Sequence, residues 1–295
     1  MYEPFYGLTE NPFRMTPDSR YFYPSARHLD ALNHMVYAID DRRGFVVITG
    51  EIGSGKTTLS RVLFQKLGSK TKTAIIRNTQ LTPRDLIELV MDEYEIDYRP
   101  GMRKMQMVGL LNEFLIEQLR RDYNVVLLID EAQNLTPSVL EEVRMLSNLE
   151  TETDKLIQII LMGQPELKDK LWLPSLTQLR QRVTLHYHLG AMDGPETVGY
   201  ILHRLKVAGG DGSPAFDEEA LARIYSYTGG VPRLINGLCD RALLTGFVNE
   251  AKPIGGAVID EVARELPALV DSPDGMVPEP EGESADAPSD REKTA

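Results

Sequence analysis

A glycine-rich segment followed by lysine and threonine is the first feature of this sequence that could do chemistry. Four residues separate two glycines, and Lys56 and Thr57 follow, which is the spacing of a phosphate-binding loop. Glycines let the backbone bend so that successive N–H groups face a phosphate at the positive end of a helix. Lys56 would reach the β- and γ-phosphates, and the Thr57 hydroxyl would bind Mg²⁺. The residues expected to contact the nucleotide are Gly50, Glu51, Ile52, Gly53, Ser54, Gly55, Lys56, Thr57 and Thr58.

Two adjacent acids, Asp130 and Glu131, end an apolar run that starts at residue 124. A continuous apolar run is typical of a strand buried on both faces of a parallel sheet. In open α/β sheets, ligands bind beyond the carboxyl ends of such strands. We therefore expect Asp130 to hold Mg²⁺, directly or through water, and Glu131 to orient and polarise the attacking water.

Three further polar residues lie where two other apolar runs end or begin. Gln164 follows the run at 156–163, where it would help to position water or would simply be a polar residue that ends a strand. Arg180 and Arg182 precede an alternating strand-like run at 183–189. Such an arginine either pairs with a nearby carboxylate or reaches the nucleotide of a neighbouring subunit as an arginine finger. Spacing alone does not separate Arg180 from Arg182.

Five strand signals separated by helical patterns must position these residues, and they predict a right-handed, parallel α/β sheet. From residue 195 onward the pattern is helical, which indicates a small lid of four helices. Arg233, at the start of the third of these helices, is placed to reach back to the phosphates. The expected parts are an N-terminal arm and first helix (1–43), a nucleotide-binding core (44–190), the lid (191–267) and a disordered, acidic, proline-rich tail (268–295).

The N-terminal arm is unusually aromatic. Its first 23 residues hold seven of the 21 aromatic side chains, interleaved with prolines. The segment is too apolar for a free tail and too broken by proline for a long helix. We expect an irregular arm that either forms an apolar wall beside the nucleotide base or straps over a core.

Composition narrows the function classes. The chain has 295 residues, of which 42% are hydrophobic, and it has neither a signal-peptide pattern nor an apolar run that approaches the ~18 residues needed to cross a bilayer. It is therefore expected to be cytoplasmic. Cys239 is its single cysteine and His186 and His188 have no further ligands nearby, so a core thiol and surface histidines are expected rather than redox or zinc chemistry.

Charge argues against avid nucleic-acid binding. The net charge is -12, and the segment 271–295 contributes eight acidic and two basic residues to it. The rest of the chain is only mildly acidic, and its basic residues fall in short groups such as Arg42-Arg43 and Arg120-Arg121.

The assembled motifs resemble those of AAA+ ATPases. The segments GEIGSGKTT, LLIDEAQNL, LMGQPEL, LRQRVTLHYHL and GGVPRLINGLCDRAL, with the aromatic opening of the chain, are similar to the ExeA/GspA (general secretion pathway protein A) type, which includes MshM-like pilus biogenesis ATPases. The resemblance implies ATP hydrolysis with Mg²⁺. It also implies a sensor role for Gln164, a role in trans for Arg182 and a second sensor role for Arg233.

The resemblance also implies a working context. We expect a homo-oligomer with ATP at the subunit junction, which couples turnover to a secretion, pilus or exopolysaccharide export apparatus. Longer members of the family carry a membrane-spanning helix after the lid, whereas this sequence continues into the acidic tail. It is therefore expected not to insert into the membrane directly, and to be recruited to the inner membrane face by a membrane-bound partner. The alternatives are a DNA-associated regulator of the transposition-ATPase type and a nucleotide-locked scaffold without turnover.

Overall fold

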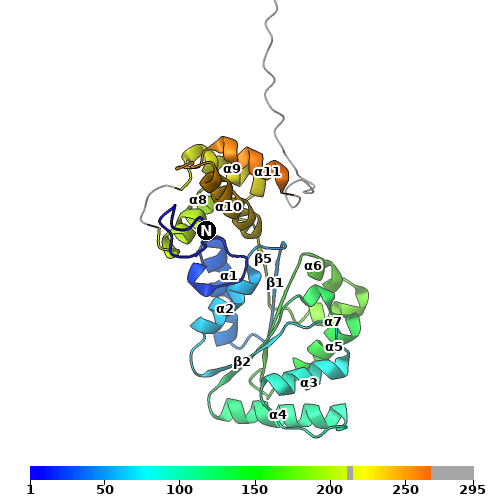
Figure 1. The fold of residues 1–295 in the computed structure, drawn as a ribbon. Helices are drawn as coiled ribbons and strands as arrows, with labels where there is room; N and C mark the ends of the chain where they lie inside the picture. The colour runs from blue at the N-terminus through cyan, green and yellow to red at the C-terminus, as the bar shows by residue number, and fades with distance from the viewer. Residues whose placement is uncertain (211–214, 267–295) are drawn as a thin grey trace, which may run out of the picture.

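A five-stranded parallel sheet forms the centre of the molecule, as a computed structural model describes it for residues 1–210 and 215–266 (Figure 1). The strand order is β2-β3-β4-β1-β5, and every neighbouring pair is parallel. Residues 268–295, predicted as a disordered tail, lie outside the described part of the chain. The strands are β1 (Phe45–Gly50), β2 (Thr71–Ile76), β3 (Asn124–Ile129), β4 (Gln158–Gly163) and β5 (Leu185–Leu189).

Helices cover both faces of the sheet, so the predicted α/β class is confirmed. Helices α1 (Ala26–Asp40) and α2 (Lys56–Lys66) lie on one side, and α3 (Pro83–Glu93), α4 (Lys104–Arg120) and α5 (Pro137–Leu146) lie on the other (Figure 1). Short helices follow β4, namely α6 (Glu166–Leu171) and α7 (Thr177–Arg180). Three single-turn 3₁₀ helices complete this part at Ser19–Tyr21, Ala132–Asn134 and Pro174–Leu176.

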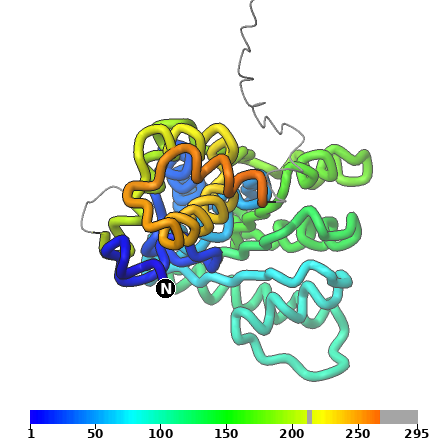
Figure 2. The backbone as a smooth tube through the Cα atoms, turned by 45° about the horizontal axis from the view of Figure 1, so that its top comes forward, coloured from blue at the N-terminus to red at the C-terminus, as the bar shows by residue number. Residues whose placement is uncertain are grey.

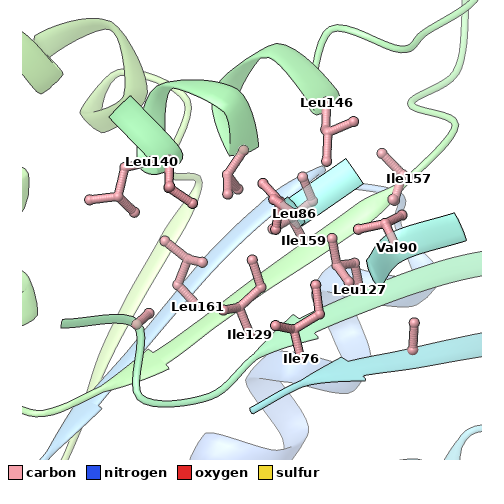
Figure 3. Close-up of a cluster of buried hydrophobic side chains, with 14 of the residues drawn as sticks. Ile76, Leu86, Val90, Leu127, Ile129, Leu140, Leu146, Ile157, Ile159 and Leu161 are labelled. Atoms are coloured by element: carbon pink, nitrogen blue, oxygen red, sulfur yellow. The ribbon is translucent and has the colours of Figure 1, made fainter. Parts of the chain in front are cut away.

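Apolar side chains of the central strands point alternately to the two faces of the sheet, which explains why helices cover both faces. Leu127 and Ile129 of β3 point into the cluster with α3, α4 and α5, whereas Val126 and Leu128 point toward α1 and α2. Figure 3 shows the first of these clusters, in which side chains of the strands meet Leu86 and Val90 from α3. Both sets are fully buried, as the apolar run from residue 124 predicts.

A separate helical part lies beyond the carboxyl ends of the strands (Figure 1). Its helices are α8 (Gly194–Val207), α9 (Glu218–Thr228), α10 (Pro232–Val248) and α11 (Gly256–Glu265). They account for the helical pattern expected from residue 195 onward, and the buried Cys239 packs among them as the expected core thiol. We call this part, residues 191–210 and 215–266, the lid.

The aromatic arm packs on the lid rather than on the sheet (Figure 2). Tyr2, Tyr6 and Phe13 are buried in the same apolar cluster as the lid helices. The Thr9 backbone N–H also donates to the Ala208 carbonyl over 2.8 Å. The arm therefore straps over the core of the lid, and its residues 14–18 and 21–23 also line the cavity between the lid and the sheet.

Helix α5 is missing from the predicted elements, although Thr136 caps it and Pro137 opens it. Among residues 1–210 and 215–266, no helix is both long and apolar enough to cross a bilayer.

Candidate functional site

A cavity of about 360 Å³ lies between the carboxyl ends of the central strands and the lid. Strands β3, β4 and β1 are neighbours in the sheet, so the segments that follow them meet at one edge. The phosphate loop follows β1, the acid pair follows β3, and Gln164 follows β4. Residues from the arm, the loop, the strand ends and the lid all line the cavity, among them Met15, Tyr21, His28, Gly55, Lys56, Thr57, Glu131, Gln164, Tyr200 and Arg233.

The phosphate loop has backbone angles that glycine favours. Gly53 has a φ of 79° and Gly55 a φ of 98°, both in the left-handed region. A Cβ on Gly53 would lie 2.3 Å from the Cβ of Arg233, so only glycine fits against the lid at this position. The glycines of the motif therefore allow both the turn of the loop and the close approach of the lid.

Lys56 is buried in the first turn of α2 and folds back over the loop. Its Nζ donates to the carbonyls of Gly50 (2.6 Å) and Glu51 (2.9 Å). Burial lowers the pKa of Lys56, while the nearby carboxylates of Glu131 and Asp130 oppose that shift. A desolvated ammonium bonded only to carbonyls is well suited to exchange them for phosphate oxygens.

Thr57 and Asp130 lie side by side, as a shared metal ligand set requires. The Thr57 hydroxyl donates to Asp130 Oδ2 over 3.2 Å, and the Glu131 N–H donates to Asp130 Oδ1 over 3.0 Å. Burial raises the pKa of Asp130. Two hard oxygen ligands fit Mg²⁺, which completes its shell with water and substrate phosphates. Within the described ranges there is no larger group of metal-binding side chains.

Glu131 is held by two glutamine side chains, one of which sequence reasoning missed. The Gln133 amide donates to Glu131 Oε2 over 2.6 Å, and the Gln164 amide donates to the same oxygen over 3.4 Å. Gln133 also accepts from the Gln164 backbone N–H over 3.0 Å, which joins the ends of β3 and β4. In the sequence, Gln133 could have been recognised as a candidate from its position two residues after Glu131, in the segment that follows β3.

The lid contributes two cationic side chains to the cavity wall. Arg233, predicted there, is the second residue of α10, and its backbone N–H donates to the Gly53 carbonyl over 3.3 Å. Arg204 of α8 was not predicted, because a buried arginine on an apolar helix face has no local signature. It is 6% exposed, and its guanidinium donates to the Tyr200 hydroxyl (2.7 Å) and the Arg14 carbonyl (3.3 Å).

Arg180 and Arg182 do not line this cavity. Arg180 lies over the ring of Trp172, with its guanidinium 4.3 Å from the ring centroid. Arg182 donates to the Ser147 carbonyl (3.4 Å) and hydroxyl (3.3 Å) at the end of α5. Neither arginine meets the phosphate loop of its own chain, so this part of the predicted constellation is not assembled within one copy.

The two predicted surface histidines meet at one threonine. His186 and His188 are exposed on β5, and each ring is 3.1 Å from the Thr49 hydroxyl of the neighbouring strand. These contacts satisfy the hydroxyl of the buried Thr49 in β1, the neighbour of the edge strand β5.

Several solved structures share this architecture. Cdc6p from Pyrobaculum aerophilum matches with a TM-score of 0.65 and 21% identity, over 84% of this chain and 71% of that one. ORC2 from Aeropyrum pernix, in ADPNP-ADP complexes, matches with a TM-score of 0.63 and 13% identity, over 87% of this chain and 71% of that one. The Thermotoga maritima RuvB branch migration motor gives a TM-score of 0.55 at 17% identity, over 82% and 69% of the two chains. At these identities the likeness shows the fold alone.

The sequence comparisons agree with the fold. Residues 39–171 match the family model of an AAA domain. General secretion pathway protein A of Aeromonas hydrophila is 42% identical over 92% of this chain, which spans 49% of that protein. The chain therefore belongs with the AAA+ P-loop proteins of the general secretion pathway protein A type.

Proposed function

We propose that this chain is an Mg²⁺-dependent ATPase that works as an oligomer and drives a secretion, pilus or exopolysaccharide export apparatus. The single observation that carries the ATPase part is that Lys56, Thr57 and Glu131 line one cavity, while Asp130 accepts a hydrogen bond from Thr57 directly behind it. Lys56 is a cation that can bind phosphate, Thr57 and Asp130 offer oxygen ligands for a metal, and Glu131 is a candidate base.

Each residue has one task in the proposed reaction. The N–H groups of residues 50–58 and the Lys56 ammonium bind the phosphates, and Arg233 adds a second cation from the lid. Bound through Thr57 and Asp130, Mg²⁺ would neutralise charge on the β- and γ-phosphates. Glu131 accepts a proton from the attacking water, and Gln164 orients that water against the γ-phosphate.

The arginine segment supports the oligomeric part of the proposal. Phosphoryl transfer is accelerated by a cation that reaches the charge developing on the transferred phosphate. Neither Arg180 nor Arg182 lines the cavity of its own chain. In the proposed oligomer, Arg182 of one copy enters the site of the next, and Arg180 is the rival for that task. A site completed in this way hydrolyses ATP only where two copies meet.

The export part of the proposal rests on the relative. That protein is named for the general secretion pathway, and this chain spans about half of its length. We propose that the chain works in the cytoplasm at the inner membrane face, through a membrane-bound partner. Hydrolysis would change the contact between the lid and the core, and the partner would receive that motion.

The first test measures nucleotide binding and phosphate release by the purified chain. We expect binding of a fluorescent ATP analogue that unlabelled ATP displaces, and release of phosphate that stops when EDTA removes Mg²⁺. Binding without any release, at protein concentrations that allow oligomers, would instead support a nucleotide-locked scaffold. Strong stimulation by DNA that declines as salt rises would favour the DNA-associated alternative.

A further inference from the structure

The first turn of α1 carries a buried histidine that contacts the phosphate loop directly. His28 is 6% exposed, and its Nε2 lies 3.1 Å from the carbonyl oxygen of Ser54. Its Nδ1 lies 2.8 Å from the hydroxyl of Ser25, the residue that caps α1. The imidazole therefore joins the start of α1 to the middle of the loop across 26 residues of sequence.

The partners of His28 define which nitrogen carries the proton. A carbonyl oxygen can only accept, so Nε2 must be the N–H that donates to Ser54. In the neutral ring Nδ1 then accepts from the Ser25 hydroxyl. Burial lowers the pKa of His28, which favours this neutral form. Both ring nitrogens are satisfied, so the ring has one orientation.

His28 is also packed so tightly against the loop that it limits the loop's conformation. A Cβ on Gly55 would lie 2.9 Å from His28 Nε2, at the residue whose left-handed φ of 98° begins α2. Phe22 also meets the His28 ring edge-on, with ring centroids 5.9 Å apart. The ring therefore contacts both the arm and the loop, and its hydrogen bond fixes the orientation of the Ser54 carbonyl.

The same turn of α1 is bonded to the lid. The Ala26 backbone N–H donates to Glu196 Oε1 of α8 over 2.9 Å, and Arg27 Nη1 donates to the Ala191 carbonyl over 2.5 Å. One turn of helix thus contacts the phosphate loop through His28 and the lid through Ala26 and Arg27. A change in the loop on nucleotide binding would displace this turn and, through it, the lid.

We propose that His28 is a positioning residue of the phosphate loop, and that the first turn of α1 transmits the state of the loop to the lid. The inference rests on the proposed nucleotide site. It adds a residue and a route that the phosphate-loop motif does not contain. His28 is bonded to the backbone of Ser54 and packs against Gly55, so the role that we assign to it is to position the loop and not to take part in catalysis.

Two amide substitutions that differ in side-chain length test the hydrogen bond between His28 and the Ser54 carbonyl. In His28→Gln the amide nitrogen is as many bonds from Cα as Nε2 is, so it can still donate to the Ser54 carbonyl. In His28→Asn the amide is one carbon shorter and cannot reach it. We expect roughly tenfold weaker binding of the ATP analogue by His28→Asn, because a buried carbonyl loses its partner, and binding within about threefold of wild type for His28→Gln. The matched control is His34→Asn, on the exposed side of the same helix.

The transmission to the lid has its own readout. Amide hydrogen exchange in the first turn of α8 should slow on nucleotide binding in the wild-type chain and in His28→Gln. In His28→Asn at saturating nucleotide this slowing should be lost, although the site is filled. A purely structural role for the ring would not separate these two variants once both sites are full.

If the wild-type chain binds no nucleotide, the proposed function fails and not the inference alone. If wild type binds and His28→Asn binds equally well, or if Gln and Asn weaken binding to the same degree, the positioning role is overturned. If binding differs as expected but protection of α8 does not, the transmission to the lid is overturned.

Discussion

Two regions of the proposed site differ in whether one copy of the chain brings their residues together. The residues around the phosphate loop meet within one copy, whereas the arginines at 180 and 182 do not reach the cavity of their own copy. Within a single copy, hydrogen bonds join the loop to the ends of β3 and β4 through Thr57, Asp130, Glu131 and Gln164. Lys56 is bonded to the carbonyls of the loop itself. The arginines at 180 and 182 contact Trp172 and Ser147 instead of the cavity. Binding of nucleotide would thus be a property of one copy, whereas fast hydrolysis would be a property of an assembly.

Removing the lysine that binds the phosphates should have the largest effect on nucleotide binding and phosphate release. In Lys56→Ala the γ-phosphate loses its buried ammonium, so we expect no measurable nucleotide binding and no phosphate release. Equilibrium binding of the fluorescent ATP analogue measures this loss. Lys66→Ala, at the exposed end of the same helix, is the control and should bind normally. Normal binding by Lys56→Ala would show that the cavity is not the phosphate site.

Removing the arginine should spare binding and reduce hydrolysis. We expect Arg182→Ala to lose roughly 1,000-fold in phosphate release at saturating ATP, because an arginine finger acts on the transition state. Affinity for ATP should stay within about threefold, which corresponds to less than 1 kcal/mol of binding free energy. Gln181→Ala, one position away and exposed, is the control. If Arg180→Ala shows the loss and Arg182→Ala does not, the finger is Arg180.

Removing the base should slow hydrolysis within the complete site. For Glu131→Gln we expect about 100-fold slower phosphate release with unchanged ATP affinity, because the amide cannot accept the proton of the attacking water. The variant should therefore accumulate in the ATP state and favour the oligomer, which light scattering after size-exclusion chromatography measures. Substantial turnover by Glu131→Gln would remove the base assignment.

The smallest effect is expected from the glutamine that holds Glu131. In Gln133→Ala the carboxylate loses its 2.6 Å donor and becomes less well oriented. We expect the turnover rate to fall about tenfold, since one hydrogen bond to a charged group is lost, with ATP affinity unchanged. Asn134→Ala, on the exposed next residue, is the control. An unchanged or faster turnover rate would show that Gln133 does not support Glu131.

The sequence predicts the parts of this molecule that depend on local pattern. The apolar runs around residues 45–49 and 124–129 become neighbours of β4 in a parallel sheet, and the polar residues that follow these strands therefore meet. The lid helices are likewise visible from their spacing and from the glycine and proline breaks. The residue patterns that specify the ends of strands and the starts of helices lie at or next to those positions in the sequence.

What the sequence did not predict depends on contacts between distant segments. His28 meets Ser54, and Gln133 meets Gln164, only because the sheet order and the helix packing bring them together. The arm could equally have covered the sheet, since its aromatic residues would be buried in either place. Arg180 and Arg182 differ by two positions, and one chain offers neither of them a phosphate to contact.

The most direct test of the account mixes two inactive variants. Arg182→Ala keeps an intact phosphate loop, and Lys56→Ala keeps an intact arginine, so a mixed oligomer would contain some complete sites. We expect phosphate release to reappear on mixing, with a maximum at intermediate ratios, while each variant alone remains inactive. No recovery at any ratio, in mixtures that light scattering shows to co-assemble, would contradict the claim that one copy completes the site of the next.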